Sequence, residues 1–94
     1  MVNPVATIGE NCTVFQGVTI GEWKGKRPHI GNNVTIFAGA KVIGNVTIGN
    51  NVVVGANAVV THDVPDNAVV AGIPARVISM KGADYVAPYA KGRM

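Results

Sequence analysis

A six-residue repeat in the middle of the chain restricts its fold more than any other feature. Residues 30–59 read IGNNVT, IFAGAK, VIGNVT, IGNNVV and VGANAV, and Val60 opens the next unit. The first position is Ile or Val, the fifth is Val or Ala, and the fourth is Asn or Gly, with Asp63 in the unit that follows. Asn and Gly tolerate positive φ, so the repeat predicts one sharp corner per hexad. An apolar repeat this short, with a corner in each unit, indicates a parallel β-solenoid.

The same register extends back to the start of the chain. First positions are filled by Val2, Ile8, Val14 and Ile20, and fifth positions by Ala6, Cys12 and Val18. Three hexads make one triangular coil of eighteen residues, and this spacing predicts three inward ladders of stacked side chains: Ile30 on Ile48, Ile36 on Val54, and Val42 on Val60. Cys12 occupies an inward position, so we expect it to be a core residue and not a reactive thiol.

One unit is longer than the others. Ten positions separate Ile20 from Ile30, so the segment 21–29 must leave the wall as a loop. This loop is basic, with Lys24, Lys26 and Arg27, and it carries Trp23. An exposed Trp in such a loop packs against a neighbouring subunit or against a ligand, and the sequence leaves both readings open.

The three corners of the predicted coil differ in composition. One corner stacks Asn11, Asn33 and Asn51, whose amides can hydrogen-bond from coil to coil. Another is lined by Gln16, Ala38 and Ala56 and is backed by Gly17, Gly39 and Asn57. We expect this stripe of small residues to form a groove with accessible backbone amides.

Length and charge limit the classes of function. A chain of 94 residues makes one small domain with a thin core, and one Cys and two His exclude a framework of disulfides or structural metal, so association is expected to stabilise it. The net charge is +3, but no basic run is long enough to argue for nucleic acid. The sequence has neither a long apolar span nor a charged leader, so we expect no membrane segment and a cytoplasmic location.

The hexads and the closing segment THDVPDNAVVAGIPARVI resemble the hexapeptide-repeat acetyltransferases, in particular the C-terminal half of serine acetyltransferases and of sugar O-acetyltransferases. The resemblance implies an all-β, left-handed parallel β-helix of about three and a half coils over residues 1–65, with the loop at 21–29 protruding. Residues 66–94 would form a C-terminal cap and tail. The family also implies a cytoplasmic homotrimer.

The resemblance further implies an acetyl-CoA-dependent enzyme that transfers an acetyl group to a hydroxyl of a sugar or of serine. The positions that match the family's cofactor site are Ala38, Gly39, Ala56, Thr61, His62 and Arg76. The guanidinium of Arg76 suits a phosphate. No metal is expected, since a γ-type carbonic anhydrase on this solenoid needs three zinc-binding histidines.

The general base is the weakest part of the match. In the family the catalytic histidine would lie a few residues before Met1, which leaves His29 as the candidate base or acceptor ligand, against a plain surface role. Serine acetyltransferases carry a His-Pro pair where this chain has Arg27-Pro28, a departure that favours a sugar acceptor. Two readings stay open: a truncated, weakly active acetyltransferase, or a non-catalytic trimeric scaffold that keeps the coenzyme A groove.

Overall fold

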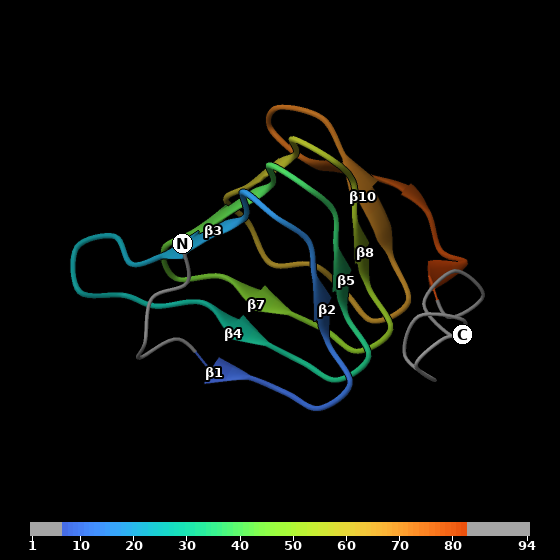
Figure 1. The fold of residues 1–94 in the computed structure, drawn as a ribbon, viewed down its shortest axis with the longest axis horizontal. Coiled ribbons are helices and arrows are strands. Elements are labelled where there is room, and N and C mark those ends of the chain that lie inside the picture. The colour runs from blue at the N-terminus through green and yellow to red at the C-terminus, as the bar shows by residue number, and fades with distance from the viewer. Residues whose placement is uncertain (1–6, 83–94) are drawn as a thin grey trace.

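The computed structural model describes residues 7–82, which wind into a coil of very short strands (Figure 1). The strands are β1 (Thr7–Ile8), β2 (Thr13–Val14), β3 (Thr19–Gly21), β4 (His29–Ile30), β5 (Thr35–Ile36), β6 (Lys41–Ile43), β7 (Thr47–Ile48), β8 (Val53–Val54), β9 (Val59–Val60), β10 (Val69–Ala71) and β11 (Arg76–Ser79). Across this part of the chain no helix has the length and apolar character needed to cross a bilayer. The eleven strands of residues 7–82 and their stacking confirm the predicted all-β solenoid.

Three parallel sheets form the walls of a triangular prism. The first wall contains β1, β4 and β7; the second contains β2, β5, β8 and β10, with β11 added at its end; the third contains β3, β6 and β9. Every pairing between successive coils is parallel, and only β11 runs antiparallel to its neighbour β10. Each coil is therefore held to the next by backbone hydrogen bonds on all three walls.

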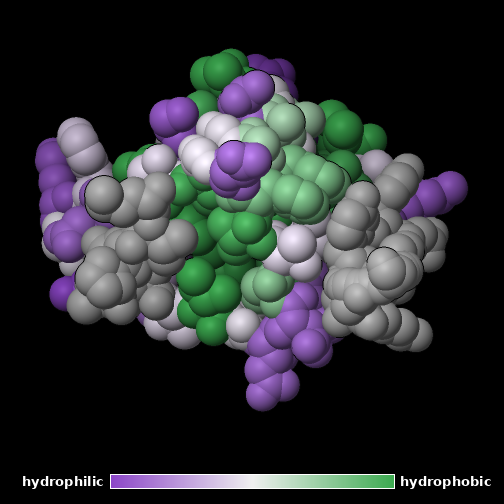
Figure 2. All heavy atoms as spheres, viewed as in Figure 1, coloured by the Kyte–Doolittle hydropathy of each residue, from purple (hydrophilic) through white to green (hydrophobic). Residues whose placement is uncertain are grey.

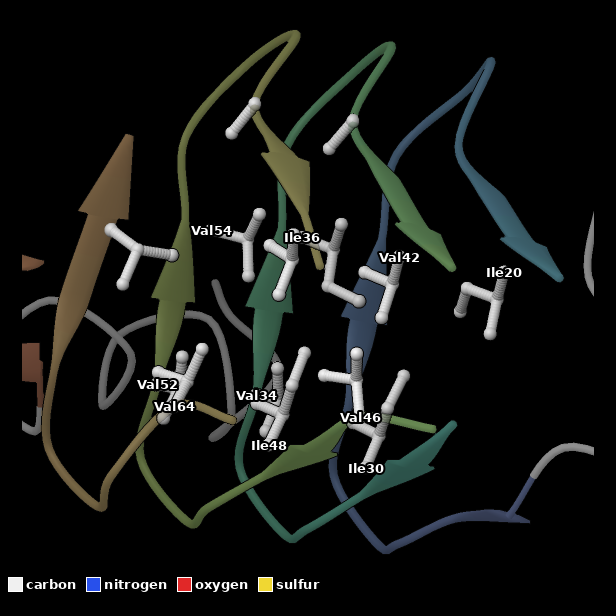
Figure 3. Close-up of a cluster of buried hydrophobic side chains, with 14 of the residues drawn as sticks. Ile20, Ile30, Val34, Ile36, Val42, Val46, Ile48, Val52, Val54 and Val64 are labelled. Atoms are coloured by element: carbon white, nitrogen blue, oxygen red, sulfur yellow. The ribbon is translucent and has the colours of Figure 1, made fainter. Parts of the chain in front are cut away.

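The three predicted ladders of inward side chains are confirmed. The Cα register pairs Ile30 with Ile48, Ile36 with Val54, and Val42 with Val60. Figure 3 labels five of them and shows these directed into the interior between the walls: Ile30, Ile48, Ile36, Val54 and Val42. Their exposed fractions are at most 3%, so branched apolar side chains fill the prism without polar interruption.

The two ends of the prism differ. In the first coil the inward residues Ile8 and Val14 are 36% and 38% exposed, because no further strand within residues 7–82 lies on that side. Cys12 is partly buried against the core, as expected, and its Sγ lies 3.2 Å from the carbonyl oxygen of Gly31. Val2 and Ala6, also expected to point inward, lie outside the described residues.

At the other end the coil continues past residue 65, where the sequence placed its limit. Val64 forms a parallel bridge with Ile48, and β10 pairs in parallel with β8. Strand β11 then folds back on β10 and covers the edge of the second wall. The part of the predicted tail beyond residue 82 lies outside the described residues.

Two of the three corners turn as predicted, at a fourth-position residue with positive φ. The Asn corner joins the first wall to the second and turns at Asn11, Asn33, Asn51 and Asn67, with φ between 58° and 64°. The Ala corner joins the second wall to the third and turns at Gly17, Gly39 and Asn57. These are the residue types with the lowest cost in the left-handed region.

The third corner, here called the loop corner, departs from the prediction. It joins the third wall to the first and turns at Gly44, with φ of 87°, and not at Asn45. The N–H of Val46 donates to the Gly44 carbonyl at 2.8 Å, a tighter turn than the other corners make. A side chain at position 44 would also have its Cβ 3.2 Å from the Cβ of Trp23, so glycine is needed for space as well as for φ.

The hydrogen-bonded ladder at the Asn corner also differs from the expected one. Fourth-position amides bond directly only once in the described chain, from Asn51 Nδ2 to Asn67 Oδ1 at 3.1 Å. The third-position side chains make the repeating contact instead, each accepting the backbone N–H of the equivalent residue one coil earlier: Asn32 from Glu10 at 2.9 Å, Asn50 from Asn32 at 2.8 Å, and Asp66 from Asn50 at 2.7 Å. This ladder satisfies corner amides that would otherwise be left without a partner.

Candidate functional site

At the Ala corner, the backbone N–H groups of the third hexad position have no side-chain acceptor like the one that the Asn corner provides. From the second coil on, the third positions of the Ala corner hold Ala38 and Ala56, both exposed, where the Asn corner holds Asn or Asp. Neither alanine N–H donates to any acceptor in the described part of the chain, whereas the fourth-position N–H groups of Gly39 and Asn57 bond to the preceding coil at 3.1 Å and 3.0 Å. Two successive coils therefore present a free, accessible N–H on one column, and such donors can bind the carbonyls of an extended ligand.

The final turn brings Arg76 close to this column. The N–H of Val59 donates to the Gly72 carbonyl at 3.1 Å, and the N–H of Ala75 donates to the Val59 carbonyl at 2.8 Å. The segment 72–76 thus lies along the edge of β9, just after the Ala56–Asn57 turn. Arg76 follows Ala75 directly and is exposed. A cation therefore lies beside the Ala corner at the end of the prism that β11 covers.

Thr61 and His62 lie at the opposite end of β9, on the loop corner. The Thr61 hydroxyl and His62 Nδ1 are 3.1 Å apart, a contact that leaves Nε2 without a partner in residues 7–82. The outer face of the third wall connects the two corners and carries Lys41, whose Nζ lies 3.5 Å from the Gly39 carbonyl. The six residues expected to bind the cofactor therefore border one wall and do not form a single compact cluster.

His29 lies on the other side of the loop corner, at the start of β4. It pairs in register with Thr7 and Thr47, and its imidazole is exposed. No carboxylate within the described residues hydrogen-bonds this ring, since the nearby Asp63 accepts the Thr47 N–H instead, at 2.9 Å. Both imidazoles of the chain thus flank the loop corner, but within residues 7–82 neither has an acidic hydrogen-bond partner to orient it.

The inserted loop projects from the body between β3 and β4 (Figure 1). Trp23 and Lys26 form an antiparallel bridge with reciprocal N–H to O distances of 2.9 Å and 3.0 Å, and Lys24 and Gly25 between them have φ of 53° and 78°. Two consecutive positive φ values are the signature of a type I′ turn. Figure 2 shows hydrophilic residues gathered at this margin of the molecule.

Metal-binding groups do not come together in the described part of the chain. Residues 7–82 contain no set of three or more His, Cys, Asp or Glu side chains placed to share an ion. The chemistry available at this surface is therefore that of free amides, exposed cations and two imidazoles.

Comparison with known proteins matches this architecture. The family model described as bacterial transferase hexapeptide (six repeats) matches residues 27–62. Residues 27–62 therefore carry the hexapeptide repeat of this family. The fold of the chain is accordingly the left-handed parallel β-helix that the resemblance implied.

Proteins similar to this chain include serine acetyltransferases. A curated one from Staphylococcus aureus is 48% identical over 86 residues, which cover 87% of this chain and 40% of that relative. The crystal structure of serine acetyltransferase from Brucella abortus strain S19 matches with a TM-score of 0.84 and 38% identity over 88% of this chain and 35% of that one. The same Brucella enzyme in complex with coenzyme A matches with a TM-score of 0.80 and 37% identity, covering 84% of this chain and 33% of that one.

The chain spans about 40% of the length of the curated relative it matches.

One feature of the site was missed in the sequence analysis, although the residues that indicate it can be read there. From the second coil on, the third hexad position is Asn or Asp at one corner and Ala at the other, and only the structure shows that this difference decides which amides are capped.

Proposed function

We propose that the chain is the coenzyme A-binding β-helix of an O-acetyltransferase. The observation that carries the proposal is the pair of uncapped N–H groups of Ala38 and Ala56, one coil apart on an exposed column. The pantetheine arm of coenzyme A is extended and carries two amides, so it can follow such a column by accepting hydrogen bonds from the protein backbone. Support comes from the similarity to serine acetyltransferases, one of which is described in complex with coenzyme A.

The proposed arrangement assigns a role to each residue around the third wall. Ala38, Gly39 and Ala56 contact the pantetheine arm, and Arg76 pairs with a phosphate of the nucleotide, where a guanidinium fork is favoured. Thr61 and His62 border the far end of the same wall, near the reacting thioester. Because one face of the ligand would remain exposed on a single prism, a neighbouring copy in a homotrimer would complete the site.

The reaction itself needs one base and no metal. An acceptor hydroxyl oxygen attacks the acetyl carbonyl carbon, the new C–O bond forms, and the C–S bond of acetyl-CoA breaks. The hydroxyl proton leaves to the base, and the departing coenzyme A thiolate takes up a proton. We assign the base to His29, because its exposed imidazole lies beside the loop corner where the wall carrying the arm ends.

The acceptor in this proposal is a hydroxyl of serine or of a sugar. The named activity of the relatives favours serine. The order Arg27-Pro28-His29, in place of the His-Pro pair of the serine enzymes, favours a sugar.

A second candidate is a non-catalytic trimeric scaffold that keeps the coenzyme A site. It is favoured by one observation: no carboxylate in residues 7–82 hydrogen-bonds either imidazole, so the described residues contain no oriented base. This candidate predicts coenzyme A binding without turnover.

A thiol-release assay with acetyl-CoA separates the two candidates. We expect release of coenzyme A that depends on added serine or sugar, and a loss of about 10²–10⁴-fold in kcat for His29→Ala. His62→Ala is the matched control, and we expect it to change kcat far less. Coenzyme A binding with no release above the uncatalysed rate would support the scaffold. Turnover that survives His29→Ala would remove that residue from the role of base.

A further inference from the structure

We propose that the hairpin at the tip of the inserted loop binds the acceptor, and that Trp23 is a stacking platform for a pyranose ring. The inference deepens the proposed function and rests on it, since it names the class of acceptor for the same site. It selects a cyclic sugar over a free amino acid.

Trp23 is exposed although its backbone is held in a hydrogen-bonded turn. Its side chain is 62% exposed, and it is the single Trp of the sequence. The two Phe residues, by contrast, stack on each other with ring centroids 5.1 Å apart. Burial of a large aromatic is strongly favourable, so one kept in solvent on an ordered element is a candidate contact for a ligand.

The turn and two neighbouring residues set the position of the ring. The reciprocal bonds between Trp23 and Lys26 and the type I′ turn fix the backbone, and the Trp23 Cβ rests against Gly44 at the loop corner. Lys24 Nζ lies 5.8 Å from the centroid of the indole, within the range of a cation–π contact. A rigid aromatic binds a ligand at a smaller entropic cost than a mobile one.

The ring of Trp23 lies beside the groups proposed for the chemistry. Gly44 directly follows β6, and the register of β6 on β9 places it one coil from His62. His29 begins β4 immediately after the loop. Trp23 therefore shares one corner with both imidazoles, so a ring stacked on it would hold its hydroxyls near the group assigned as base.

The chemistry of the tip favours a sugar over serine. The axial C–H groups of a pyranose form an apolar face that packs on an aromatic ring, while its hydroxyls remain free for polar partners. Serine has no such face. Lys24, Lys26 and Arg27 add positive charge at the same tip, which suits a pyranose that carries a carboxylate or phosphate.

The test uses the intrinsic fluorescence of Trp23, which needs no turnover. We expect glucuronic acid and N-acetylglucosamine to change the emission saturably, with half-saturation at roughly 1–10 mM, whereas L-serine and the acyclic polyol sorbitol leave it unchanged. Free N-acetyltryptophanamide with the same sugars corrects for non-specific quenching. Emission that responds to serine and to no pyranose would overturn the proposal, as would emission that changes on dilution of the protein alone, since a neighbouring copy would then cover the ring.

A kinetic variant provides the second readout. Trp23→Ala should raise KM for the sugar about 3- to 10-fold with kcat nearly unchanged, while Trp23→Phe retains most of the affinity. Coenzyme A binding should be the same in both variants. If the unsubstituted chain does not bind coenzyme A, the proposed function is wrong. If it binds coenzyme A but Trp23→Ala leaves KM for the sugar unchanged, only this inference is wrong.

Discussion

At the scale of single residues, the close spacing of the coils explains why Gly occupies the second hexad position of the Asn corner, directly before the polar third position. Each of Gly9, Gly31 and Gly49 lies under a side chain from the next coil, and a Cβ at Gly31 would lie 2.5 Å from Asn50 Oδ1. That oxygen is the acceptor for the Asn32 N–H. Glycine is therefore needed here for space between coils, and the hydrogen-bonded ladder depends on it.

We predict that Gly31→Ala lowers the free energy of unfolding by about 2 kcal/mol or more. The added methyl group must displace Asn50, which removes the cap on a corner amide as well as the close packing. Gly21→Ala is the control, because a Cβ there would meet its nearest atom at 3.6 Å. Urea denaturation that gave equal stabilities for the two variants would contradict this reading of the corner.

A second prediction at this scale concerns Arg76 in the proposed cofactor site. Arg76→Ala should weaken coenzyme A binding about 3- to 10-fold at low ionic strength and much less in about 0.5 M salt, because an exposed charge contact is screened. Calorimetry at both salt concentrations measures this, with Lys81→Ala as a control of equal charge. An equal loss for both variants would show general electrostatic attraction and no specific phosphate contact.

At the scale of elements, the two ends of the prism differ in how far their inward side chains are covered. Its last coil is covered by β11 and by the segment 72–76, whereas Ile8 and Val14, the inward residues on two walls of its first coil, are 36% and 38% exposed. The same residue type therefore has a different energetic role at each level of one solenoid. Burial, and not the repeat position alone, sets its contribution to stability.

This difference can be measured with one substitution at two levels. Ile36 is fully buried and Ile8 is 36% exposed. We predict that Ile36→Ala costs about 3–4 kcal/mol in unfolding free energy and Ile8→Ala about 1–2 kcal/mol. Equal costs would mean that the end of the first coil is covered in solution.

Most of the architecture could be predicted from the sequence, because the hexad specifies both the inward ladder and the corner. The register of Ile30 on Ile48 follows from counting alone. The turn at Gly44 could not be predicted, since Gly and Asn both tolerate positive φ and the close approach of Trp23 to Gly44 joins two different coils. Strand β10 was missed because the hexad register shifts between Val60 and Val64. Val60 pairs with Val42, eighteen residues earlier, whereas Val70 pairs with Val54, sixteen residues earlier. For the candidate site, the residue positions could be predicted from the sequence. Which backbone amides stay uncapped could not, because the acceptor for an amide of one coil is a side chain of the next coil.

At the scale of the whole molecule, a slender prism with charged and small-residue corners is expected to associate. We predict a homotrimer with cyclic symmetry, because a thin core gains stability from burial between copies and the proposed cofactor site needs a second wall. Sedimentation equilibrium at micromolar concentration should give three times the mass of the chain. A folded, stable monomer under those conditions would contradict the shared site.

Titration calorimetry with coenzyme A measures whether the uncapped amides of the Ala corner bind this ligand. We expect saturable binding that Ala56→Trp abolishes, because the indole would cover the column. Glu10→Trp, which places the same side chain at the same hexad position of the Asn corner, should leave binding intact. Absence of binding to the unsubstituted protein, or binding that Ala56→Trp leaves unchanged, would show that these amides do not form the site.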